Sequence, residues 1–326
     1  MKLSPPTDLA GLARLILSPE CRSICVLTGA GVSVASGIPD FRSPGGMYDT
    51  LQPDLITASP AERQLMRQDP TYVVSWDIFR QNQFPYLEVR KPFILGTREK
   101  KWKATISHRF FELLHTKTNK LTRLYTQNID GLDFQCTKIP TEKIVPVHGS
   151  LSQVQCEGCE TPVDLDTFCD QLESNVKDIY SQGDANPKAP KESTNIPCLK
   201  CKRPLVKPTT VLFGRSLPEQ FFQCTQSDLP SCDLLIVAGT SLVVSPANSL
   251  VYAVPETTIR VVVNRDPVGQ ELGISYGGDQ IGRDMFAQGD CDQVFLELVK
   301  ELGWMDDLKL VLDDLPPSSV ERIRKL

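Results

Sequence analysis

The sequence contains no hydrophobic run long enough to cross a membrane. Of its 326 residues 40% are hydrophobic, but no uninterrupted apolar stretch approaches the ~20 residues that a spanning helix needs. The N-terminal segment also lacks an unbroken apolar run followed by a cleavage site, so we expect no secretory signal peptide. Asp8 and Glu20 make a mitochondrial presequence the weaker alternative. We therefore expect a nuclear or cytoplasmic protein that does not bind membranes.

An excess of basic charge is also missing. The 35 Lys and Arg residues are outnumbered by 40 Asp and Glu residues, and the net charge is -5, so no overall positive field attracts nucleic acid. Some local basic charge comes from Lys188, Lys191, Lys200 and Lys202. Acidic residues between Asp164 and Asp178 offset it, and no aromatic platform accompanies it. Nucleic acid is therefore the least favoured partner.

Histidine is scarce, with three residues, whereas cysteine is plentiful, with 11. An odd number of cysteines in a chain of this length does not fit a secreted disulfide framework. Four of them form two Cys-x-x-Cys pairs: Cys156, Cys159, Cys198 and Cys201. Two such pairs can close a tetrahedral site around one Zn²⁺, and no spare ligand suggests an open position. We predict a structural zinc ion; a redox role for the pairs is the less favoured reading.

A glycine-rich turn follows the first apolar run, Ile24 to Leu27. The turn reads Gly29, Ala30, Gly31 and leads to Ser33. A buried strand that breaks into such a turn before a helix exposes N–H groups suited to a diphosphate. A Gly-Ile-Pro turn follows, and after it come Asp40, Phe41 and Arg42. A loop that only binds phosphate does not need these three residues, so they favour a larger ligand.

Several later apolar runs also end in small or polar residues. These runs are 121–127, 144–147, 208–216, 233–238 and 259–263. The residues at their ends include Gln127, Asn128, Ile129, Asp130, His148, Gly149, Gly239, Thr240, Ser241, Asn264, Arg265 and Asp266. Strands that alternate with helices predict an α/β fold with a doubly wound parallel sheet, whose ligands lie at the carboxyl ends of the strands.

Helical patterns occupy the segments between the runs. They cover 7–22, most of 58–116 and 292–303, whereas 84–104 is less regular. We expect His108 and His115, within one helix, to be structural. His148 follows a strand directly, which favours a functional role. The segment beyond about 312 is expected to be an exposed helix or partner segment.

Six motifs follow one another along the chain: the glycine turn with Ser33 and Gly37–Arg42, then Thr126–Asp130, His148-Gly149, the paired cysteines, Phe213-Gly214 and Gly239–Ser241. In this order they resemble the sirtuin family of NAD-dependent protein lysine deacylases. The resemblance covers about residues 8–305. It implies a Rossmann-like parallel sheet with helices on both faces, plus a small zinc-ribbon domain and a helical insertion. We predict a large domain from about 8–50, 117–152 and 207–305, a small domain from the insertion 51–116 and the zinc module 153–206, and a tail at 306–326.

The resemblance also implies the roles of individual residues. His148 would be the general base and Asn128 would hold a water or a ribose hydroxyl. The residues expected to bind NAD are Gly29, Ala30, Gly31, Ser33, Asp40, Phe41, Arg42, Gln127, Asn128, Ile129, Asp130, His148, Gly239, Thr240, Ser241, Asn264, Arg265, Asp266 and Cys291. An acetyl-lysine protein, for example a histone, would add as a strand beside Val211, Leu212, Phe213 and Gly214. The products would be nicotinamide, 2'-O-acetyl-ADP-ribose and free lysine.

The chain departs from the family pattern at several positions. Asp133–Cys136 replaces the usual His or Glu and a later Ala-Gly, and Arg215 stands where Glu is usual. Sirtuins specialised for acidic acyl groups carry Tyr and Arg at positions that align with Met47 and Asp49 here. Because an Asp would repel a succinyl carboxylate, we expect neutral acyl groups as substrates.

Two other functions would use the same residues. A mono-ADP-ribosyltransferase would share the whole site, and the sequence does not separate it from a deacylase. A catalytically silent NAD-binding or zinc-dependent scaffold is disfavoured, because it would have no need of both His148 and Asn128.

Overall fold

A computed structural model describes residues 4–38, 46–180, 189–276 and 282–325. Its central feature is a six-stranded parallel sheet in the order β3-β2-β1-β7-β8-β9. The strands are β1 (Ile24–Thr28), β2 (Leu121–Thr126), β3 (Ile144–Pro146), β7 (Leu234–Ala238), β8 (Ile259–Asn264) and β9 (Asp284–Gln288). The predicted Rossmann-like sheet is confirmed. β9 was missed, because Asp284 and Gln288 interrupt its apolar pattern.

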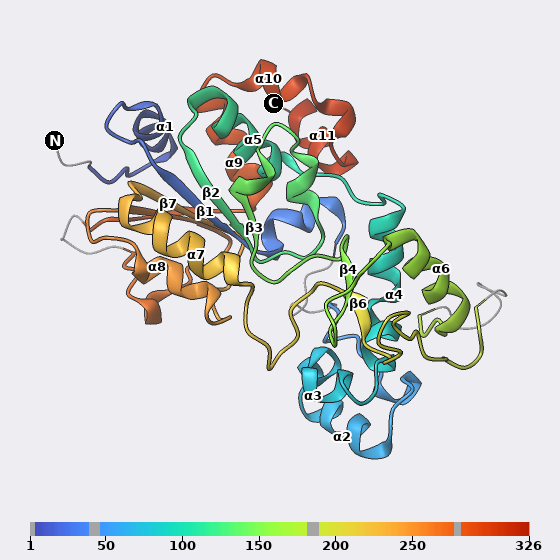
Figure 1. Cartoon of the computed structure of the whole chain (residues 1–326). Helices are drawn as coiled ribbons and strands as arrows, with labels where there is room; N and C mark the ends of the chain where they lie inside the picture. Colours follow the sequence, from blue (N-terminus) through green and yellow to red (C-terminus); the bar gives the residue numbers. More distant parts are fainter. Residues whose placement is uncertain (1–3, 39–45, 181–188, 277–281, 326) are drawn as a thin grey trace.

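Helices cover both faces of this sheet (Figure 1). One face carries α1 (Leu9–Leu17), α5 (Ile106–Thr118), α9 (Cys291–Glu301), α10 (Met305–Lys309) and α11 (Pro317–Arg324), and the other carries α7 (Glu219–Asp228) and α8 (Leu250–Ala253). Alternate side chains of β1 point to opposite faces: Ile24 and Val26 enter the first core, and Cys25 and Leu27 enter the second. A strand buried on both faces needs apolar residues throughout, which explains its unbroken hydrophobic run.

The strand order reverses direction at β1. From β1 the chain crosses to β2 and β3 on one side, and it returns to β7 on the other side. The loops after β1 and β7 therefore leave the sheet in opposite directions and open a crevice at their carboxyl ends. This is the point where an open α/β sheet binds its ligand.

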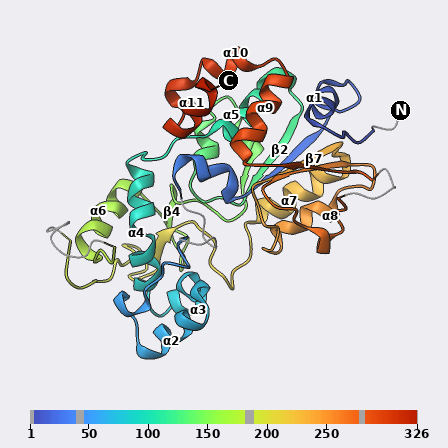
Figure 2. The same cartoon turned by 180° about the vertical axis from the view of Figure 1, so that it is seen from behind.

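A second group of elements has its own core. It contains α2 (Pro60–Gln68), α3 (Trp76–Phe79), α4 (Phe84–Arg98), α6 (Leu165–Asn175) and a three-stranded antiparallel sheet of β5 (Pro162–Val163), β4 (Val154–Cys156) and β6 (Val206–Pro208). Figure 2 shows this group from behind, set to one side of the large sheet. The domain limits given above remain a prediction.

Two local expectations were wrong. Segment 84–104 was expected to be less regular than its neighbours, but α4 runs unbroken from Phe84 to Arg98 with Pro92 inside it, and only 99–104 lies outside a helix. Segment 208–216 was expected to be a strand. Regular pairing ends at Pro208, and among the described residues that follow, β-type pairing is limited to an isolated bridge between Phe213 and Ser75.

The C-terminal segment was expected to be exposed, and this was also wrong. Leu315, Ser319 and Ile323 are buried, and α11 packs against both α9 and the short helix η1 (Ala30–Ser36) of the glycine turn. The Ser319 hydroxyl donates to Asp292 on α9 over 2.6 Å. Among the described helices, none has the length and apolar character to span a bilayer.

Candidate active site

The glycine turn after β1 lies against the turn after β7, backbone to backbone. The Gly31 N–H donates to the Gly239 carbonyl over 2.8 Å. A Cβ on Gly31 would lie 2.5 Å from the Gly239 Cα, which is closer than any real contact. Gly239 has φ +62 and faces Gly31 in return. Glycine at both positions is therefore a packing requirement, and it lets two sheet loops form one rim.

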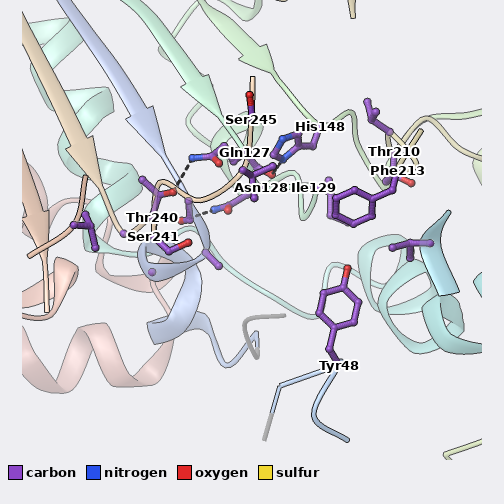
Figure 3. Close-up of a pocket in the computed structure, with 18 of the residues that line it drawn as sticks. Tyr48, Gln127, Asn128, Ile129, His148, Thr210, Phe213, Thr240, Ser241 and Ser245 are labelled. Atoms are coloured by element: carbon purple, nitrogen blue, oxygen red, sulfur yellow. Dashed lines mark hydrogen bonds between the residues drawn. The ribbon is translucent and has the colours of Figure 1, made fainter. Parts of the chain in front are cut away.

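This rim borders a cavity of about 600 Å³ (Figure 3). Its wall includes most of the described residues predicted to bind NAD: Gly29, Ala30, Gly31, Gln127, Asn128, Ile129, His148, Gly239, Thr240, Ser241, Asn264, Arg265, Asp266 and Cys291. Ser33 and Asp130 line an adjoining smaller cavity that shares Ala30, Asn128 and Ile129 with the first. The structure thus brings these residues together, although they come from six separate segments of the chain.

A chain of hydrogen bonds fixes the floor of the site. The Asn128 side-chain amide donates to the Gly29 carbonyl over 3.0 Å and to the Ser33 hydroxyl over 3.1 Å. Ser33 in turn donates to the Asp130 carboxylate over 2.7 Å. Burial raises the pKa of Asp130 above its ordinary value. Asn128 is therefore held by the cofactor turn itself.

The backbone of Gln127 determines the tautomer of His148. His148 Nδ1 lies 3.0 Å from the Gln127 carbonyl oxygen, and because that oxygen only accepts, Nδ1 must carry the proton. Nε2 is then the basic nitrogen. The Gln127 side chain donates to Thr240 Oγ1 over 2.9 Å, which ties the same residue to the second loop of the rim.

Residues 211–214 form one edge of the cavity. The Val211 N–H donates to the His148 carbonyl over 2.9 Å, and the Phe213 N–H donates to the Val74 carbonyl over 3.0 Å. All four predicted peptide-binding residues line the cavity, and Phe213 is 44% exposed. Figure 3 shows the Phe213 ring directed toward Ile129 and His148.

The far end of the cavity contains the residues expected near adenosine. The Asn264 side chain donates to the Asp266 carbonyl over 3.1 Å, and Arg265 pairs with Asp290 over 3.1 Å. Cys291 is buried at the start of α9, and burial raises the pKa of its thiol to about 12. Its thiol is therefore protonated and inert near neutral pH.

The remaining sequence expectations separate into three groups. Asp40, Phe41 and Arg42 lie outside the described residues. Met47 is buried in the small core and Asp49 is exposed, and neither is among the residues that line the cavity. The expectation of neutral acyl groups, which was based on Asp49, stays a prediction. His108 and His115 are also absent from the cavity wall, as expected.

Sequence reasoning missed Tyr48, Tyr86, Arg90 and Thr210, which also line the cavity. Tyr86 and Arg90 lie one turn apart on α4, where they have the spacing of ordinary core-facing helix positions. Only the packing of α4 beside residues 210–214 places them at the site. The sequence carried no signal for them, because the burial of Arg90, which is 6% exposed, is known only from the structure.

The four predicted zinc ligands converge. The Cys156 and Cys201 sulfurs are 3.6 Å apart, and the Cys159 and Cys198 sulfurs are 3.7 Å apart. A tetrahedral Zn²⁺ with Zn–S bonds of about 2.3 Å requires sulfurs about 3.8 Å apart. All four sulfurs lie within 4.8 Å of one another, so the donor set fits zinc.

Comparison with known proteins identifies the family. The model of the Sir2 family matches residues 29–246. The NAD-dependent protein deacetylase hst2 of Schizosaccharomyces pombe is 33% identical over 319 residues, covering 98% of this chain and 83% of that protein. Sirtuin-2 of Danio rerio is 33% identical over 94% of this chain and 75% of its own length, and human sirtuin-1 is 34% identical over 88% of this chain and 33% of its own length. The chain belongs to the Sir2, or sirtuin, family.

Proposed function

We propose that the protein is an NAD-dependent protein lysine deacetylase. Family membership supports the reaction class. The observation that carries the proposal is the position of His148: an imidazole whose Nδ1–H is held by a backbone carbonyl, at the junction between the NAD-binding rim and the peptide edge. A histidine in this tautomer is equipped to accept a proton near neutral pH.

NAD would bind as a co-substrate across the rim and supply a ribose carbon that becomes electrophilic as nicotinamide leaves. His148 Nε2 would then accept a proton from a ribose hydroxyl, so that the acyl group passes from the lysine nitrogen to the ribose. Asn128, fixed by Gly29 and Ser33, would hold a ribose hydroxyl or a water. One water would be consumed, and the products would be free lysine, nicotinamide and acetyl-ADP-ribose.

The acetylated protein would bind as an extended strand along residues 211–214. The Phe213 N–H donates to the Val74 carbonyl, and the Phe213 carbonyl accepts from the Trp76 N–H. A peptide would therefore pair with backbone groups of the residues next to Phe213. Backbone pairing reads side chains weakly, so histones and other acetylated proteins are both compatible partners.

A mixture of full-length protein, NAD and an acetyl-lysine peptide tests this function. Coupled loss of acetyl and release of nicotinamide is expected, and His148→Ala should abolish both. His115→Ala is the matched control, because His115 lies outside the cavity on α5 and should retain wild-type activity. A peptide that gains ADP-ribose would instead indicate the transferase, and zinc-bound, folded protein without nicotinamide release would indicate a scaffold.

A further inference from the structure

Arg215 lies at the end of the edge along which the substrate peptide is proposed to bind. This edge, residues 211–214, ends in a turn: Gly214 has φ +88, and the Arg215 N–H donates to the Leu212 carbonyl over 3.0 Å. Arg215 lines the main cavity beside Phe213 and Gly214. Its side chain is 45% exposed, so part of the guanidinium is open to a ligand that lies along the edge.

Two neighbours hold the guanidinium of Arg215 in place. It lies over the ring of Trp76, 4.8 Å from the ring centroid, where a cation is attracted to an aromatic face. Trp76 is itself fixed to the edge, because its N–H donates to the Phe213 carbonyl over 2.9 Å. The second neighbour is Glu157, whose carboxylate is 3.5 Å from the guanidinium, longer than an ordinary N–H···O hydrogen bond. The cation is therefore positioned but only loosely paired.

Glu157 also pairs with a closer cation. Lys207 Nζ lies 2.8 Å from the other oxygen of the carboxylate, and it donates to the Pro208 carbonyl over 2.8 Å and to the Thr210 carbonyl over 2.5 Å. Burial lowers the pKa of Lys207, but three acceptors around one nitrogen match the three N–H donors of an ammonium, whereas a neutral amine has two. One carboxylate thus serves two cations, and this corner of the cavity keeps a net positive charge.

We infer that Arg215 makes the enzyme prefer an acetyl-lysine that has an Asp or Glu within two residues of it in the substrate protein. The inference rests on the proposed function. A peptide paired along residues 211–214 passes the guanidinium as it leaves the edge, and residues of an extended strand are spaced about 3.3 Å apart. Side chains one or two residues from the acetyl-lysine are therefore within reach of Arg215. A carboxylate at such a position gains a charge-assisted hydrogen bond, and a lysine is repelled.

The preference belongs to binding, because the substrate carboxylate takes no part in the reaction. Arg215 therefore acts as a specificity residue. Since its side chain is half-exposed, water and salt screen the new ion pair, so the preference is severalfold and falls as ionic strength rises.

The test uses the full-length protein, NAD and a set of peptides, each with one acetyl-lysine in an otherwise neutral sequence. Glu, Gln or Lys is placed at one of the four positions within two residues of the acetyl-lysine, and kcat/KM is measured by mass spectrometry. Glu and Gln have nearly the same shape, so their ratio isolates the charge. On one side of the acetyl-lysine we expect Glu to exceed Gln about threefold, mainly through KM, and Lys to be the poorest. The ratio should approach one at about 0.5 M salt.

Two variants identify the cation responsible. Arg215→Met should bring the ratio of Glu to Gln peptides close to one, and Arg215→Glu should reverse it. Each ratio is taken within one variant, so a change in overall activity does not affect it. Arg67→Met is the matched control and should keep the wild-type ratio. Arg67 is also 45% exposed and pairs with a carboxylate, that of Asp54, but it lies on α2 and is not among the described residues that line the cavity.

Equal kcat/KM values for Glu and Gln peptides at all four positions in the wild type would overturn this inference and leave the proposed function intact. A preference for Glu that persists in Arg215→Met would also overturn it, because the recognising cation would then lie elsewhere. If Arg215→Glu does not fold beside Glu157, Arg215→Met decides alone. Failure to deacetylate any of the peptides would overturn the proposed function, on which this inference rests.

Discussion

At the scale of single residues, one backbone carbonyl decides which nitrogen of His148 is basic. Gln127 contributes this oxygen, and its side chain also contacts Thr240. The sequence pointed to Gln127, Asn128 and His148 because each follows a strand directly. It did not indicate Arg90 or Tyr86, whose role depends on how α4 packs against residues far along the chain. Strand ends converge by topology, whereas the approach of a helix is a matter of tertiary packing.

The protonation of Asp133 couples stability to pH. It is 2% exposed, and burial raises the pKa of its carboxyl to about 6. In the unfolded chain the same group titrates near 3.9, so the folded state binds more protons between these values, and stability falls as pH rises through this range. The full penalty above pH 6 is on the order of 3 kcal/mol.

Asp133→Asn should therefore stabilise the protein more at pH 8 than at pH 5, by about 1 kcal/mol. Urea unfolding of both proteins at the two pH values measures this difference. Asp306→Asn, whose side chain is 98% exposed on α10, serves as the control. An equal effect of Asp133→Asn at both pH values would show that the carboxylate is not destabilised by burial.

At the scale of elements, the regular strands were predicted well and their irregular neighbours were not. β1 and β7 are almost entirely apolar because both of their faces are covered, and β8 has one charged residue inside it, the buried Arg260. Residues 209–216 also contain an apolar run, Val211 to Phe213, but the backbone N–H groups of this segment donate to three separate residues, Gln153, His148 and Val74. Composition indicates that such a segment is extended and half-buried, but it does not indicate which residues accept its backbone hydrogen bonds.

Asp292 joins three helices and should be a large contributor to stability. Its carboxylate, 2% exposed, accepts from the Ser107 N–H over 2.9 Å, from the Ile106 N–H over 3.3 Å and from the Ser319 hydroxyl over 2.6 Å. Asp292→Ala would leave these buried donors unsatisfied, and we expect a loss of about 3 kcal/mol in the free energy of unfolding. Ser319→Ala should cost about 1 kcal/mol.

Chemical denaturation measures both losses, and Asp306→Ala provides an exposed carboxylate for comparison. If Asp292→Ala were as stable as the wild type, the C-terminal helix would not be an integral part of the core.

At the scale of the whole molecule, the small core that holds the zinc cluster also supplies part of the cavity wall. The small core that contains Cys156 and Cys198 also contains residues of α4 and Leu212. These elements build the wall of the cavity opposite the sheet. A metal bound by the four cysteines would therefore stabilise part of the cavity wall without contacting it.

Metal analysis should find one zinc per chain. Cys156→Ser or a strong chelator should remove zinc and lower deacetylase activity about tenfold or more, because the cavity wall loses its support. Cys169→Ser, a buried cysteine of the same core outside the cluster, should keep the zinc. Full activity in zinc-free protein would show that the metal does not support the cavity wall.

The contact between Gly31 and Gly239 has a consequence during synthesis of the protein. The two halves of the rim are made at different times on the ribosome, because Gly31 is synthesised well before Gly239. A fragment that ends before Gly239 lacks the backbone partner of Gly31. We therefore expect such a fragment not to consume NAD.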